Sequence, residues 1–259
     1  MEDLRGSRRN NQNRITKIEM KFGQTQFGVV IPAYNEPRLK LLLERFDFSK
    51  TPHVVVVNDG STDDSISKIE NFPVKIISHE SRCGVGAAIR TGLNYLKESK
   101  FEIAVVMAGN NKDNPDEIPN LLKAIEDGAD YVQGSRYLGS KQLGAMPFLR
   151  RLATRIVPIL WSIRFRRRFT EVTNGFRSYK LSLLNHPDID IEQDWLNKYE
   201  LEFYIHYKVL ELGFKYAEVP VSKVYPSDGM SISKIKLFGN WDWWSLLRPL
   251  VLLSLGMKK

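Results

Sequence analysis

The chain has 259 residues, of which 42% are hydrophobic, so it can build a sizeable core and is not disordered throughout. Its 38 lysines and arginines outnumber its 30 aspartates and glutamates, and the net charge of +8 indicates an anionic partner such as a nucleotide, a phosphorylated lipid, a membrane surface or nucleic acid. The single cysteine, Cys83, excludes an internal disulfide and a cysteine metal cluster and favours a reducing, cytosolic setting.

The two ends of the chain differ from its middle. Residues 1–26 are polar and basic and lack the apolar core of a signal peptide, so we expect a mobile tail there. Residues 27–240 are expected to form the folded domain, and a Trp-rich segment, 241–259, follows it. The most apolar window, 246–256, is about half of the roughly 20 residues that a spanning helix needs, so we expect no membrane-spanning segment.

Short apolar runs typical of buried strands recur at 27–32, 53–58, 74–78, 103–107 and 131–134. Helical patterns lie between them at 37–46, 61–72, 84–99 and 115–128. This alternation predicts an α/β fold with a mainly parallel sheet that helices cover on both faces. In such sheets ligands bind beyond the carboxyl ends of the strands.

The second half of the chain has a different character. Seven arginines fall between positions 150 and 168, a "TNGFRSY" turn follows, and a helical pattern over 199–212 precedes a predicted strand at 215–221. No flexible linker separates the halves, so we expect one globule.

A carboxylate lies directly after the second apolar run. Asp59 opens "NDGSTDDS", in which Gly60 permits a tight turn and Ser61 can cap a helix. A carboxylate at a strand end can accept hydrogen bonds from a ribose or a base edge, and the alternative is a plain turn between strand and helix.

Six motifs occur in order along residues 27–234: "VVIPAYNE", "VVNDGSTDDS", "GVGAAIRTGL", "DYVQGSRYL", "TNGFRSYK" and "KYAEVPV". Together they resemble the family 2 inverting glycosyltransferases with the GT-A fold, and within them the dolichol-phosphate (polyprenyl-phosphate) mannosyltransferase-like group. Each motif is weak alone, and the ordered set is specific.

The resemblance implies a nucleotide-sugar donor site at the first strand ends. The residues that it assigns to the donor are Pro32, Tyr34, Glu36, Asp59, Gly84 and Gly86. For the loop 84–88, a close contact between helix and sheet that needs small residues is an equal alternative.

The family's acidic D-x-D signature, which holds Mg²⁺ or Mn²⁺ against the donor diphosphate, is replaced here. Ala108 and Asn110 occupy its two acidic positions, and Lys112 follows with a charge that repels a cation. We expect Lys112, with Asn110, to steady the leaving diphosphate in place of the metal. The alternatives are a solvated loop lysine and a remodelled metal site that uses Asn110, Asp113 or Asp116.

The resemblance places a lipid phosphate near the arginine of "GSR", Arg136, which we also count among the catalytic residues. The other candidate residues for the acceptor phosphate are Arg150, Arg151, Arg177 and Lys234. The planar guanidinium of arginine suits a phosphate. Glu171 replaces an aspartate that usually begins the "TNGFRSY" segment in the family. For Arg177, the alternative to a role at the acceptor phosphate is a purely structural one.

Two surfaces are candidates for membrane contact. The basic run 164–168 is either a solvated face or a docking site for anionic lipid headgroups. The tail around Trp241, Trp243 and Trp244 is either an interfacial helix or a core helix or oligomer contact.

These features predict transfer of a hexose from GDP- or UDP-hexose to a polyprenyl or dolichyl phosphate, by a peripheral enzyme at the cytosolic face of the membrane, in the assembly of cell-envelope glycans. One alternative is transfer to a saccharide hydroxyl, for which Glu200 or Glu202 would be the base. Another is a catalytically silent sugar-nucleotide-binding protein. The basic residues do not belong to a known reader of nucleic acid, so no nucleic-acid partner is expected.

Overall fold

The computed structural model describes residues 26–139, 146, 148–225 and 244–258. The expected N-terminal tail, apart from Gln26, lies outside these residues, as do Lys234, Trp241 and Trp243. Among the helices that the structure describes, none combines the length and apolar character needed to cross a bilayer.

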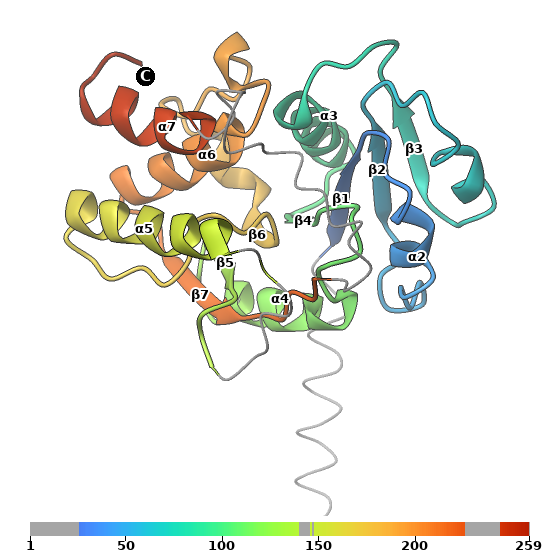
Figure 1. The fold of residues 1–259 in the computed structure, drawn as a ribbon, viewed down its shortest axis with the longest axis horizontal. Coiled ribbons are helices and arrows are strands. Elements are labelled where there is room, and N and C mark those ends of the chain that lie inside the picture. Colours follow the sequence, from blue (N-terminus) through green and yellow to red (C-terminus); the bar gives the residue numbers. More distant parts are fainter. Residues whose placement is uncertain (1–25, 140–145, 147, 226–243, 259) are drawn as a thin grey trace, which may run out of the picture.

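Seven strands form one sheet in the order β3-β2-β1-β4-β6-β5-β7 (Figure 1). Their bounds are β1 Phe27–Ala33, β2 Val54–Asn58, β3 Lys75–Ser78, β4 Ile103–Val106, β5 Tyr131–Ser135, β6 Arg177–Lys180 and β7 Tyr216–Pro220. Strand β6 is antiparallel to β4 and β5, and the other neighbouring pairs are parallel. The predicted mainly parallel sheet is confirmed, and the five predicted strands of the first half form with bounds shifted by at most one residue.

Helices cover both faces of the sheet. The α-helices are α2 Leu39–Leu43, α3 Val85–Glu98, α4 Ile118–Glu126, α5 Phe148–Phe165, α6 Glu200–Glu211 and α7 Trp244–Ser254. Short 3₁₀ helices occur at Ser67–Ile69, Pro115–Glu117, Leu181–Asn185 and Asp194–Leu196. Helices α5, α6 and α7 gather on the side of the molecule away from β3 (Figure 1).

The apolar run of β1 explains why it lies in the middle of the sheet. Val29 and Ile31 belong to the core that α2 and α4 cover, whereas Val30 belongs to the core under α3. All three side chains are buried, so a continuous apolar run rather than an alternating one is what this position requires.

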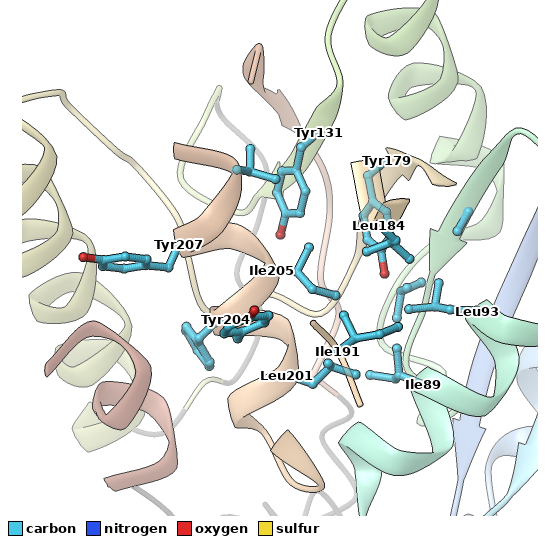
Figure 2. Packing of buried hydrophobic residues seen from close by; sticks show 14 of the residues in the cluster. Ile89, Leu93, Tyr131, Tyr179, Leu184, Ile191, Leu201, Tyr204, Ile205 and Tyr207 are labelled. Carbon is cyan, nitrogen blue, oxygen red and sulfur yellow. The ribbon is translucent and has the colours of Figure 1, made fainter. Parts of the chain in front are cut away.

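The second core joins α3 to α6 over the sheet. Figure 2 shows this cluster, with Ile89 and Leu93 of α3 facing Leu201 and Ile205 of α6. The ring of Tyr207, which belongs to the same cluster, points towards α5, where it meets Trp161. Helix α7 packs on α6, and its Leu250 and Leu253 are buried in the same core.

Two local predictions need correction. The pattern at 61–72 gives only the 3₁₀ helix Ser67–Ile69, because the side chain of Asp63 accepts hydrogen bonds from the backbone and hydroxyl of Ser65 and so offers an alternative to helix. The expected turn "TNGFRSY" runs into strand β6, which inserts between β4 and β5.

Candidate functional site

The carboxyl ends of β1 and β2 bring two predicted donor motifs together. Asn35, which has a left-handed φ of 44°, receives a hydrogen bond from the backbone of Thr62 at 2.8 Å and donates from its own backbone to Ser61 Oγ at 3.0 Å. Parallel pairing sets Ala33 beside Asn58, so Tyr34 and Glu36, which follow Pro32 and the end of β1, leave the sheet next to Asp59. The guanidinium of Arg82 lies 4.4 Å from the centre of the Tyr34 ring.

Asp59 is buried and holds the loop that leads into α3. Its carboxylate accepts hydrogen bonds from the backbone N–H groups of Cys83 at 2.8 Å and Gly84 at 2.9 Å, and it lies 2.9 Å from Nδ1 of His79. Gly60, with a φ of 70°, permits this approach, since a Cβ there would lie 2.6 Å from the backbone of Ser81. Asp59 therefore fixes the conformation of the loop before α3 by binding its backbone N–H groups.

The glycines at the start of α3 have a packing role. A Cβ on Gly84 would lie 2.2 Å from the carbonyl oxygen of Asn197, and one on Gly86 would lie 2.1 Å from that of Leu196. These close contacts require glycine, and they agree with the packing alternative for the loop 84–88.

The loop after β4 carries the residues that replace the acidic pair. The environment of Gly109 is largely apolar, since a Cβ there would meet Ile31 and Leu39. Asn110 accepts a hydrogen bond from the backbone of Lys112 at 3.3 Å. Arg45 braces the loop by donating to Asn111 Oδ1 at 2.7 Å and to Asn114 Oδ1 at 2.9 Å.

Lys112 and Arg136 meet at one tyrosine. The Lys112 ammonium lies 5.2 Å from the centre of the Tyr225 ring, and Arg136 Nη1 donates to the Tyr225 hydroxyl at 3.1 Å. All three side chains are buried. The structure thus brings together two residues that the sequence assigns to phosphate chemistry, from the ends of β4 and β5.

Arg136 is held by the segment that precedes β6. Its Nε donates to Glu171 at 2.6 Å and its Nη2 donates to Thr173 Oγ1 at 2.6 Å. Burial alone would lower the pKa of Arg136, but the charge and the hydrogen bond of Glu171, with contributions from Tyr225 and Tyr137, together raise this pKa, so the guanidinium stays charged. Glu218 accepts backbone hydrogen bonds from Thr170 and Glu171 and fixes their loop.

Asp113 lies at the same edge with its carboxylate already paired. Lys223 Nζ donates to its two oxygens at 2.8 and 3.0 Å and to Asn174 Oδ1 at 2.7 Å. Lys223 belongs to residues 221–225, which we call the post-β7 segment. This segment also supplies Tyr225, and it crosses the ends of β4 and β5.

Other predicted acceptor residues lie elsewhere. Arg177 is buried in the core, where it donates to the Tyr131 hydroxyl at 2.9 Å, to the carbonyl of Glu202 at 3.0 Å and to that of Asn174. Arg151 lies on α5 and is half-buried. The side chain of Arg150 and all of Lys234 lie outside the described residues.

The two carboxylates considered as a base both have cationic partners. Glu202 Oε1 lies 3.3 Å from Arg177 Nε, and Glu200 Oε1 accepts a hydrogen bond from Arg248 at 3.4 Å. Both belong to the first turn of α6.

The loop from Ala108 to Asp113 does not fit a divalent cation. Ala108 and Gly109 offer no side-chain oxygen, Asp113 is neutralised by Lys223, and Lys112 adds a further positive charge. A second group, Asp59, His79 and Cys83, has ligand atoms within 4.8 Å of one another. Both ring nitrogens of His79 and both oxygens of Asp59 already lie within hydrogen-bond distance of protein partners, which a metal would have to displace.

A cavity of about 620 Å³ lies at the opposite, amino edge of the sheet, beside Glu102, Glu126 and Lys180. The loops that join the predicted site residues are at the other edge, so this cavity is not the candidate site.

The sequence did not single out Lys223 or Tyr225. Both follow the "KYAEVPV" strand, and their contacts are long-range: the separation is 110 for Lys223 with Asp113, 49 for Lys223 with Asn174 and 89 for Tyr225 with Arg136. The available signal was the polar "SKVY" directly after an apolar strand.

Comparison with known proteins gives a consistent result. The model of glycosyl transferase family 2 matches residues 28–185. The polyprenol monophosphomannose synthase of Mycolicibacterium smegmatis is 26% identical over 202 residues, which cover 75% of this chain and 76% of that protein. The undecaprenyl-phosphate mannosyltransferase of Micrococcus luteus is 27% identical over 202 residues, which cover 75% and 82%.

A solved structure shares the fold. Glucosyl-3-phosphoglycerate synthase from Mycobacterium tuberculosis, in complex with Mn²⁺ and UDP-glucose, superposes with a TM-score of 0.66 at 17% identity, covering 95% of this chain and 84% of that one. The predicted GT-A fold is confirmed by this likeness.

Proposed function

The chain belongs to glycosyl transferase family 2 and is a glycosyltransferase, and from this premise we propose that it transfers a hexose from a nucleotide diphosphate sugar to the phosphate of a polyprenyl or dolichyl lipid. A lipid phosphate oxygen attacks the anomeric carbon, and the bond from that carbon to the nucleoside diphosphate breaks with inversion. The names of the two relatives above, which are polyprenol and undecaprenyl-phosphate mannosyl enzymes, support this acceptor class.

One observation carries the proposal. Helix α5 connects the site that contains Lys112 and Arg136 to an exposed apolar stripe. Tyr137, next to Arg136, shares a hydrogen bond between its hydroxyl and that of Thr154 in α5. The guanidinium groups of Arg136 and Arg155 lie 5.8 and 5.7 Å from the centre of the Tyr137 ring. Positive charge therefore continues from the sheet edge onto α5.

The exposed face of α5 has the composition of an interfacial helix. Its apolar members recur at helical spacing, and they are Leu152, Ile156, Ile159, Leu160 and Ile163, of which Ile163 is 71% exposed. Exposed arginines accompany them at 155, 164 and 166–168. Apolar side chains that enter the headgroup region, together with arginines that pair with anionic lipids, would bring a lipid phosphate to the sheet edge.

A phosphate acceptor also agrees with the carboxylates. A saccharide hydroxyl needs a base to remove its proton, whereas a lipid phosphate is already an oxyanion. Glu200 and Glu202 both lie beside arginines, so their charges are committed to these partners. The proposed site is at the cytosolic face of the membrane, where nucleotide sugars are available, and the product would serve the assembly of envelope glycans.

The test is an extraction assay on the purified protein. Radiolabelled GDP-mannose, UDP-glucose and UDP-N-acetylglucosamine are each offered with polyprenyl phosphate, and the label in the organic phase is measured. The matched control acceptor is polyprenol without the phosphate. We expect labelled lipid with one donor and only with the phosphate. Label in a saccharide acceptor instead would favour the hydroxyl alternative, and no transfer to either acceptor would favour a binding protein.

A further inference from the structure

A side-chain ammonium lies among oxygen ligands at Asp113, a residue of the loop after β4 that the sequence offered as a metal ligand. We propose that Lys223 is a built-in cation that replaces the metal as the organiser of this edge, so that transfer requires no divalent ion. This inference rests on the proposed function, and it concerns how the leaving diphosphate is stabilised.

The ligands of the Lys223 ammonium are those of a hard cation. Both oxygens of Asp113, a residue with 0% exposure, and Oδ1 of Asn174 surround Nζ at 2.7–3.0 Å. Carboxylate and amide oxygens are the groups that Mg²⁺ and Ca²⁺ select in proteins. Asp113, one of the two acids that the sequence offered as metal ligands in this loop, is therefore already paired with a monovalent charge.

The backbone delivers Lys223 to this place. Residues 113 and 223 form an isolated antiparallel bridge, and the N–H of Val224 donates to the carbonyl of Lys112 at 2.9 Å. On the other side, the N–H of Ser222 donates to Glu117 at 2.8 Å. The backbone on both sides of Lys223 is thus fixed, on one side by main-chain pairing with the loop after β4 and on the other by the side-chain carboxylate of Glu117.

A divalent ion at Asp113 would have to displace this ammonium. The ion would then lie beside Lys223, which is buried with 6% exposure, and close to Lys112, the residue before Asp113. Like charges in a site shielded from water repel strongly, and a buried lysine that loses its carboxylate partner has no compensation for its lost hydration. The charge balance of the loop therefore opposes a metal.

Lys223 acts as a positioning residue for the two cations that would face the leaving group. Its pairing with Asp113 anchors the post-β7 segment, and that segment sets Tyr225 between Lys112 and Arg136. Fixed ammonium and guanidinium groups can stabilise charge that develops on a departing diphosphate, which is the work of the metal in metal-dependent transferases.

The first test uses the full-length protein stripped of metal. The rate of labelled-lipid formation is measured in excess EDTA and after addition of Mg²⁺ or Mn²⁺, and calorimetry gives the affinities for UDP and GDP under both conditions. We expect each quantity to change less than about threefold, since the charge-stabilising groups are part of the chain. A loss of more than about tenfold in EDTA that Mn²⁺ restores would overturn the inference.

The second test examines whether removal of Lys223 creates a metal site. In Lys223→Ala, the carboxylate of Asp113 loses its cation, so we expect Mn²⁺ to raise the melting temperature of this variant but not that of the wild type. The double variant Lys223→Ala/Asp113→Ala is the matched control and should not respond. Mn²⁺ binding by the wild type that disappears in Asp113→Asn would contradict the proposal.

These outcomes separate the inference from the function on which it rests. If no donor gives labelled lipid under any condition, the proposed function fails, and the nucleotide affinities and Mn²⁺ titrations still decide whether this edge holds a metal. If lipid forms only with Mn²⁺, the function stands and the inference fails.

Discussion

At the scale of single residues, His206 is a buried base without a hydrogen-bond partner. Its ring is stacked near Tyr131 and Tyr216, and within the described residues neither ring nitrogen has a partner. Burial lowers the pKa of His206 well below 6.5, and the charges of Arg177 and Arg167 lower it further. The imidazole is therefore neutral in the folded protein.

This neutral histidine predicts a loss of stability in acid. Below its ordinary pKa of about 6.5 the unfolded chain binds a proton at His206 that the folded chain does not, so the free energy of unfolding falls by about 1.4 kcal/mol per pH unit from this residue. The variant His206→Phe should lose that part of the slope between about pH 6.5 and 5. Urea unfolding at several pH values measures it, with the exposed His53→Gln as control. If the free energies of unfolding of wild type and His206→Phe differed by the same amount at every pH, the account would be contradicted.

Asp59 offers a second prediction at this scale. Asp59→Ala removes the acceptor of two backbone N–H groups, so we expect the free energy of unfolding to fall by about 1–3 kcal/mol, as for hydrogen bonds to a charged group. The released loop should also weaken binding of UDP or GDP by about tenfold, roughly 1.4 kcal/mol, in calorimetry. The exposed Asp64→Ala is the control. Lower stability with unchanged affinity would remove Asp59 from the donor site.

At the scale of elements, α5 should attach the protein to membranes. Ile159 and Ile163 are 57% and 71% exposed, so insertion of each would add part of the about 1.5–3 kcal/mol that full burial of an isoleucine contributes. The double variant Ile159→Ser/Ile163→Ser should therefore partition less into anionic vesicles in a flotation assay. Leu41→Ser, which changes an exposed leucine of α2, is the matched control. Equal flotation of both variants would exclude α5 as the attachment face.

The elements also show what the sequence can reveal. Strands β1, β2 and β4 were predictable because their apolar runs are buried on both faces, and α3 was predictable from the periodicity of its apolar face. Strand β6 is only four residues, "RSYK", and its buried Arg177 is stabilised by tertiary contacts that no local pattern indicates. The helix expected at 61–72 failed because local side-chain hydrogen bonds compete with helix formation.

At the scale of the whole molecule, the site is assembled from distant segments. The strand ends that carry Tyr34, Asp59 and Lys112 were predictable because carboxyl ends of parallel strands share one edge. The pairing of Asp113 with Lys223 was not, since it depends on the order of β4, β5 and β7 in the sheet and on the path of the chain after β7. The predicted role of Arg177 at the acceptor phosphate remains a prediction, and its burial in the core favours the structural alternative.

The most direct test of the central claim is phosphorus NMR of the complete reaction with donor sugar and polyprenyl phosphate. The account predicts that nucleoside diphosphate appears in equal amount with a new lipid phosphodiester, while the lipid phosphomonoester disappears. Release of nucleoside diphosphate with an unchanged lipid phosphomonoester signal would mean that the sugar goes to a hydroxyl or to water, and it would contradict the lipid-phosphate acceptor.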